Sequence, residues 1–208
     1  MFPAETIVSF FIASLLLAAT PGPDNIFVLT QSTLQGARAG LIVTTGLCTG
    51  LVAHTTAVAI GVAAIFHTSA FAYTALMLIG ACYLSYLAWQ AFRTSAKKMA
   101  KGENKPTGLI KLYQRGIIMN ITNPKVSLFF LAFLPLFSNP ARGMLSLQIM
   151  VLGMLFIIAT IIVFGLVAVV AGSAGQRFNR SEKMHRVMNI MAGTVFATLA
   201  AGIIIQLR

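Results

Sequence analysis

Six long runs of apolar residues follow one another along the chain, with short polar connections between them. They cover approximately residues 6–34, 41–66, 71–92, 116–137, 147–171 and 187–207. Each run is close to the roughly 20 residues that an α-helix needs to cross a bilayer, and about twice the length of a barrel strand. Backbone polar groups in lipid must be paired within their own segment, as they are in a helix. The pattern therefore predicts an all-α, polytopic bundle of six transmembrane helices.

Composition and charge agree with this prediction and orient the bundle. The chain is 58% hydrophobic and only 9% charged, against about 25% charged residues in a typical soluble domain. Its net charge of +11 would suit nucleic acid, but eleven of the fifteen bases lie in residues 93–115 and 177–186, between apolar runs. With the N-terminus outside, twelve bases fall on the inner side and two on the outer side. The positive-inside rule then predicts that both termini lie outside.

The two halves of the chain also resemble each other. A shift of 103 residues places Pro21 on Pro124, Gly40 on Gly143, and Gly50 on Gly153. Each unit would contain three spans, an odd number, so the second unit must be inverted in the membrane. We expect two inverted three-helix repeats, residues 1–92 and 116–208, joined by a basic cytoplasmic loop over residues 93–115. Inverted repeats with broken helices are a recurring plan of transporters.

The first segment is interrupted by the sequence Thr20-Pro21-Gly22-Pro23-Asp24-Asn25. Two prolines remove two backbone donors and clash with the preceding turn, so the helix must open here. A carboxylate within a span needs a polar cavity or a cation beside it. We expect one half of a binding site at Pro21, Gly22, Pro23, Asp24 and Asn25, with Thr20 as an additional candidate. The plainer alternative is a kink with Asp24 at a water-exposed helix end.

The fourth segment contains a second interruption, Asn120-Ile121-Thr122-Asn123-Pro124-Lys125. It again joins a proline to polar residues and one embedded charge, here positive. Asn120, Asn123, Pro124 and Lys125 are expected to form the other half of the site, with Thr122 as an additional candidate. Asp24 and Lys125 would then pair, or flank a zwitterion whose carboxylate meets a helix N-terminus. The plainer alternative is that Lys125 extends to the membrane interface.

Other side chains allow further hypotheses. His54 would either relay a proton or pack between helices. Cys48 and Cys82 lie in apolar runs without a CxxC motif, which favours buried thiols; a transmembrane redox carrier using both is the alternative. The spans contain no cluster of metal ligands and no pair of nucleophile and base. We therefore predict that the protein binds no metal or cofactor and is not an enzyme. A carrier of another small ion or metabolite remains an alternative.

Taken together, these motifs resemble those of the LysE/RhtB family of amino-acid exporters. The resemblance is carried by Pro21-Gly22-Pro23-Asp24 and by Asn120 with Thr122-Asn123-Pro124-Lys125. It extends over nearly the whole chain and looks nearest to the homoserine and threonine exporters. It implies efflux of amino acids or close derivatives across the bacterial cytoplasmic (inner) membrane, with protons as the coupling ion of an antiport. Glycine-containing helix faces also make a homodimer plausible.

In some members of this family an acid follows the glycines of the second span. Here Leu51 and His54 occupy that region. This difference leaves Asp24 as the main candidate for a group that takes up and releases a proton.

Overall fold

The computed structural model describes residues 2–20, 22–68, 70–93, 107–174 and 182–206. All regular secondary structure in these residues is helical, which confirms the predicted all-α fold. The helices are α1 (Ala4–Ala19), α2 (Pro23–Gln35), α3 (Ala37–Thr68), α4 (Ala70–Arg93), α5 (Leu109–Ile121), α6 (Pro124–Leu136), the 3-10 turn η1 (Pro140–Arg142), α7 (Leu145–Ala174) and α8 (Glu182–Gln206).

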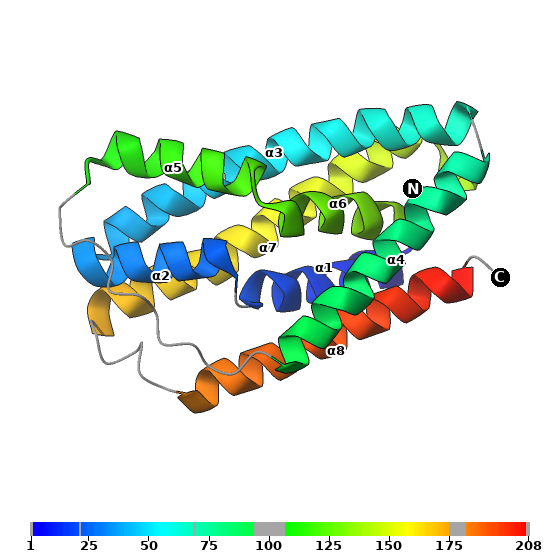
Figure 1. The fold of residues 1–208 in the computed structure, drawn as a ribbon. Coiled ribbons are helices and arrows are strands. Elements are labelled where there is room, and N and C mark those ends of the chain that lie inside the picture. Colours follow the sequence, from blue (N-terminus) through cyan, green and yellow to red (C-terminus); the bar gives the residue numbers. More distant parts are fainter. Residues whose placement is uncertain (1, 21, 69, 94–106, 175–181, 207–208) are drawn as a thin grey trace.

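The predicted breaks in the first and fourth spans are confirmed. Helices α1 and α2 are bent by 61° relative to each other, and α5 and α6 by 58°. Proline begins the second helix of each pair, at position 23 and at position 124. Proline is favoured there because the first helical N–H has no partner within the helix. Both breaks lie near the middle of the length of the bundle (Figure 1).

The number of membrane crossings follows from the long helices and the bent pairs. Three described helices, α3, α4 and α7, are individually long and apolar enough to cross a membrane, and counting each bent pair as one span gives up to five. Helix α8 has a shorter apolar stretch, Gly193–Ile205. Helix α1 begins and α8 ends at the same end of the bundle (Figure 1), so the predicted sixth crossing would have to be made by α8.

Helix α5 begins at Leu109, earlier than the predicted segment start at residue 116. The bases in this first part, Lys111 and Arg115, are exposed, whereas Leu112 is fully buried against α3. A search for uninterrupted apolar residues misses such a helix start, because only one of its faces is apolar.

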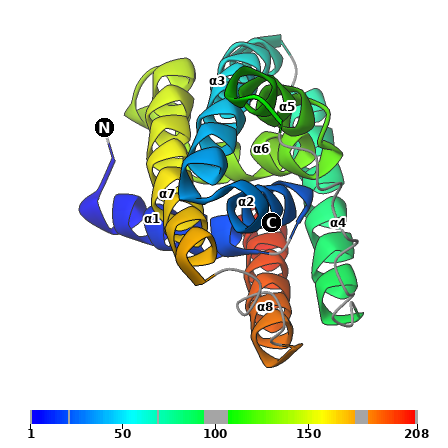
Figure 2. The same cartoon turned by 90° about the vertical axis from the view of Figure 1, so that its left-hand side faces the viewer.

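Helices α3 and α7 lie side by side and run in opposite directions through the bundle (Figure 1). Each also packs against the broken span of the other half: α3 against α5, and α7 against α1. Helices α4 and α8 pair with each other and extend beyond the other helices (Figure 2).

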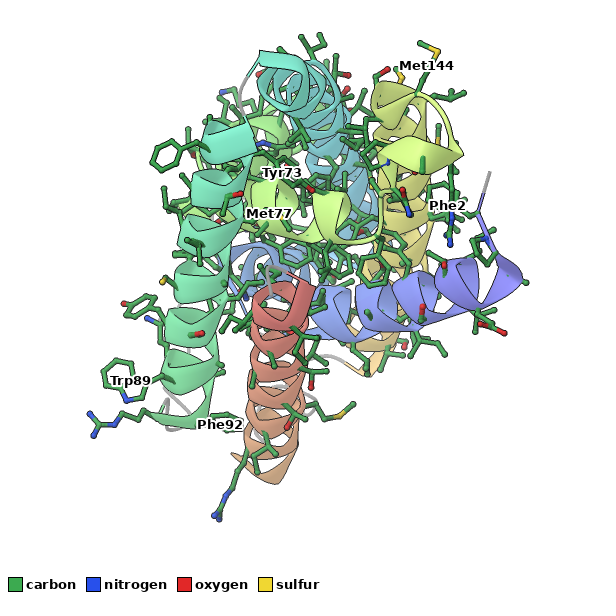
Figure 3. All side chains as sticks on the ribbon, turned by 90° about the vertical axis from the view of Figure 1, so that its right-hand side faces the viewer. Phe2, Tyr73, Met77, Trp89, Phe92 and Met144 are labelled. Carbon is green, nitrogen blue, oxygen red and sulfur yellow. The ribbon has the colours of Figure 1, made fainter. Side chains whose placement is uncertain are left out.

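The outer face of α4 carries aromatic side chains. Tyr83, Tyr86 and Trp89 follow one another with ring centroids 6.2 and 6.1 Å apart, and the Arg93 guanidinium lies 4.7 Å from the Trp89 ring. Figure 3 shows Trp89 and Phe92 at the last turns of α4, with Phe92 on the side of α8, where its ring covers Gly193. Aromatic rings and a base at a helix end are typical of the membrane–water interface.

Glycines permit the close contact between α3 and α5. A Cβ atom on Gly46 would overlap the carbonyl oxygen of Tyr113, and one on Gly116 would lie 2.7 Å from the carbonyl oxygen of Val43. By contrast, a Cβ atom on Gly61, also in α3, would have no neighbour within 4 Å. The backbones of α3 and α5 can approach this closely because neither glycine has a side chain.

We therefore expect Gly46→Ala to destabilise the protein by about 1–3 kcal/mol, the usual cost of overpacking. Gly61→Ala is the matched control and should melt at or slightly above the wild-type temperature. The melting temperature of each variant is the temperature at which heated samples lose the monodisperse peak in size-exclusion chromatography in detergent. Equal melting temperatures for the two variants would contradict the close contact.

Candidate functional site

The Asp24 carboxylate joins the two broken spans. Asp24 lies in the first turn of α2 and is only 7% exposed. Its Oδ2 accepts a hydrogen bond from Asn120 Nδ2, and its Oδ1 accepts one from Asn123 Nδ2, both at 3.1 Å. One asparagine lies in the last turn of α5 and the other at the start of α6. Hydrogen bonds to an ionised acceptor are the stronger kind, so this carboxylate links one break directly to the other.

At the second break Pro124 has no N–H to donate, so the polar groups beside it find partners outside the regular helical pattern. The Asn123 side chain caps α6 instead, its Oδ1 accepting a hydrogen bond from the Lys125 backbone N–H at 3.0 Å. The Asn120 carbonyl, which a residue at position 124 would bond in a continuous helix, lies 3.1 Å from His54 Nε2. A carbonyl can only accept, so the His54 nitrogen donates. His54 thus supports the break from α3.

The first break is closed by similar contacts. The Asn25 side chain donates to the carbonyl of Ala18 at 2.8 Å, and the Thr20 hydroxyl donates to the carbonyl of Leu16 at 3.1 Å. Gly22 is the N-cap of α2 in an extended conformation. The predicted site residue Pro21 lies outside the described residues.

A cleft opens between the two breaks. It encloses about 540 Å³ of space between atoms, part of it open to the outside. The predicted residues that line it are Thr20, Gly22, Asp24, Asn25, Asn120, Asn123 and Lys125. Pro23, Pro124, Thr122 and His54 are not among its lining residues. The two prolines begin α2 and α6, and Thr122 is the exposed residue that follows the end of α5.

Lys125 gives the cleft a positive pole opposite Asp24. Its side chain is in the first turn of α6, where the helix N-terminus already carries a partial positive charge. The ammonium lies 5.4 Å from the Phe196 ring centroid of α8, within the range of a cation–π contact. Lys125 and Asp24 also attract each other electrostatically. The site therefore has one group of each charge, one from each broken span.

The remaining wall is apolar, and sequence reasoning missed it. Its residues are Leu17, Ala18, Leu51, Val126, Phe129, Phe130, Phe156, Phe164 and Phe196, with the hydroxyl of Thr160 among them. Helical spacing could have found part of this wall. Phe156, Thr160 and Phe164 recur every four residues on one face of α7, and Phe129 follows Lys125 by four residues on α6.

The structure places the cysteines away from this cleft. Cys48 is buried in α3 and Cys82 is exposed in α4; both are free thiols, and neither lines the cleft. Over the described ranges, no three His, Cys, Asp or Glu side chains gather closely enough to hold a metal ion.

A cleft open to water makes a labelling prediction. In a Cys48→Ala/Cys82→Ala background, we expect Val126→Cys, on the cleft wall, to react with a charged methanethiosulfonate reagent. Ile121→Cys should remain unreacted, because residue 121 is 46% exposed but is absent from the cleft lining, and lipid prevents a thiol from ionising. Mass spectrometry of membranes after timed labelling measures both rates. Labelling at position 126 that is no faster than at position 121 would contradict a cleft open to water.

Comparison with known proteins places the chain in a family. The family model described as LysE type translocator matches residues 15–207. A protein of Vibrio cholerae serotype O1 called an uncharacterized membrane protein is 30% identical over 190 residues, 91% of each chain. The homoserine/homoserine lactone efflux proteins of Salmonella typhimurium and Salmonella typhi are each 29% identical over 201 residues, 93% of each chain. No solved structure matches the chain. This multi-pass membrane protein belongs to the LysE type translocator family.

Proposed function

We propose that this protein is a secondary transporter that exports amino acids or close derivatives, of the homoserine or threonine kind, by proton antiport. The observation that carries the proposal is the cleft in which Asp24 of one broken span and Lys125 of the other are both lining residues. Membership of a translocator family supports the transport class. Two relatives named for homoserine and homoserine lactone efflux support the class of solute.

The cleft suits a zwitterion of small size. A substrate carboxylate would bind at the N-terminus of α6 beside Lys125, where helix dipole and ammonium act together. A substrate ammonium would bind Asp24. The carbon chain would lie against the aromatic wall of α6 and α7.

Transport would proceed by alternating access around this site. In the proposal, residues 1–92 and 116–208 are the two inverted repeats, and they rock against each other about the cleft. Asp24 takes up a proton on one side and releases it on the other. In the proposal, the protein lies in the bacterial cytoplasmic membrane with both termini outside, an orientation that puts the basic stretches on the cytoplasmic side.

Efflux from preloaded cells tests the proposal. Cells with and without the protein are loaded with a panel of labelled amino acids, supplied as dipeptides, and the loss of label is followed over time. Faster loss of homoserine or threonine from cells that contain the protein is the expected result. Equal retention of every solute in the panel would rule out amino-acid export.

Variants of the two charged residues test the site. Asp24→Asn and Lys125→Ala should each reduce efflux to the rate of cells without the protein while leaving membrane insertion intact, because each removes one pole of the site. Glu5→Gln and Lys111→Ala are matched controls, since both residues are exposed at helix starts. Their efflux should equal that of the wild type. Wild-type efflux in either site variant would contradict the assignment.

The cysteines provide a separate test against the redox alternative. Export by the Cys48→Ala/Cys82→Ala variant should equal wild-type export, because neither thiol lines the cleft. The same efflux assay measures it, with protein levels matched by immunoblot. Loss of transport in this variant at normal abundance would support a redox role instead.

A further inference from the structure

Asn120 and Asn123 both donate to Asp24 through the NH₂ group of the side-chain amide, but they differ in the bonding of the amide oxygen. Asn123 uses both ends, since its Nδ2 donates to Asp24 and its Oδ1 caps the Lys125 N–H of α6. Asn120 uses one end only. Its Nδ2 donates to Asp24, while its buried Oδ1 has no hydrogen-bond partner among the described residues. Buried acceptors without a partner are uncommon in native structures and call for an explanation.

We propose that Asn120 is the positioning residue that turns its amide over when Asp24 takes up a proton. This inference rests on the proposed proton coupling through Asp24. Proton uptake forms an O–H bond at Asp24 Oδ2, and the Asn120 amide rotates by half a turn about its Cβ–Cγ bond. Its Oδ1 then accepts the hydrogen bond from the protonated Oδ2. Asn123 keeps its orientation and continues to donate to Oδ1 of Asp24.

The reason lies in what a protonated carboxyl group requires. An ionised carboxylate accepts hydrogen bonds at both oxygens, but a carboxylic acid must donate one. An amide that keeps its NH₂ group toward the new O–H would place donor against donor. Rotation of the Asn123 amide would break the cap of α6. Rotation of the Asn120 amide would only replace the hydrogen bond donated by its Nδ2 with one accepted by its Oδ1. The number of hydrogen bonds made by Asn120 stays the same.

Gly50 provides the space for this rotation. A Cβ atom at Gly50 would lie 2.6 Å from Asn120 Oδ1 and 2.7 Å from Asn120 Cβ. The absence of a side chain at Gly50 therefore lets the unbonded end of the Asn120 amide lie against α3, and the NH₂ group would occupy the same space after the turn. The Asn120 backbone is held separately, since its carbonyl bonds His54 Nε2 and the Asn123 N–H. Only the side chain needs to move.

Among the described residues, two charged or titratable side chains act electrostatically on Asp24. Lys125 acts on it from α6 and His54 from α3. The residues that α1, α7 and α8 contribute to the cleft are uncharged. A test of Asp24 protonation must therefore separate the Asp24 signal from any signal of the His54 imidazole. The variant His54→Gln removes the imidazole and keeps a donor for the Asn120 carbonyl.

Infrared difference spectroscopy against pH tests the proposal on the full-length purified protein. The carboxyl band of Asp24 is identified by its loss in Asp24→Asn. Asn120→Ser and Asn123→Ser are then compared, each alone and with His54→Gln. Serine is too short to replace the amide, but it can cap α6 at position 123 and bond its own helix at position 120. Asn120→Ala serves in place of Asn120→Ser if the serine variant does not fold.

The two variants should shift the titration midpoint of the Asp24 band by different amounts. Asn123→Ser removes a donor that favours mainly the carboxylate, so the titration midpoint of the Asp24 band should rise by about one pH unit. Asn120→Ser removes one hydrogen bond from each protonation state, so the midpoint should move by less than about half of that. The side-chain amide signal of the turning asparagine should appear in the wild-type and Asn123→Ser difference spectra and disappear in Asn120→Ser.

Three outcomes decide the matter. The pattern above supports the turning role of Asn120. A midpoint that rises as far in Asn120→Ser as in Asn123→Ser, or an amide signal lost only in Asn123→Ser, overturns that role and leaves the proposed export function standing. An Asp24 band that does not respond to pH while the protein stays folded overturns both the turning role and proton coupling through Asp24, but not amino-acid export itself.

Discussion

The hydrogen bonding of one carboxylate by two amides across the bundle holds the centre of this protein together. Asp24 belongs to the first broken span, and both of its partners, Asn120 and Asn123, belong to the second. A carboxylate at this depth costs several kcal/mol unless polar groups replace its water. The two amides and the nearby Lys125 provide that replacement. The same contacts fix the relative position of the breaks, and with it the shape of the cleft.

The close helix packing around the breaks brings these groups together. Gly46 and Gly116 allow α3 and α5 to touch backbone to backbone, and Gly50 lets Asn120 lie directly against α3. This proximity is also what allows His54 of α3 to reach the Asn120 carbonyl that Pro124 leaves without its helical partner. The glycines, Pro124 and His54 thus all act on the same short stretch of backbone at the second break.

The sequence alone predicted the breaks, the helical fold and the two opposite charges, because proline and embedded charges are strong local signals in an apolar run. It did not predict that the side chains of Asn120 and Asn123 donate to Asp24, because side-chain partners depend on helix rotation, which prolines do not determine. The aromatic wall was missed for a related reason. In a span made mostly of apolar residues, Phe156 and Phe164 do not stand out from residues that face lipid.

The size of the central interaction matches the task proposed for it. Each hydrogen bond to a charged group contributes about 1.5–3 kcal/mol, so the two on Asp24 amount to about 3–6 kcal/mol. A two-state protein needs about 5.5 kcal/mol to move from 1:99 to 99:1 in favour of one state. Protonation would leave both bonds in place but neutral, and a neutral bond is roughly half as strong. About 1.5–3 kcal/mol would therefore be lost, which changes the balance between two conformations about tenfold or more without unfolding any helix. Because Asp24 is in one half of the chain and its amide partners are in the other, that energy acts directly on how the two halves sit against each other.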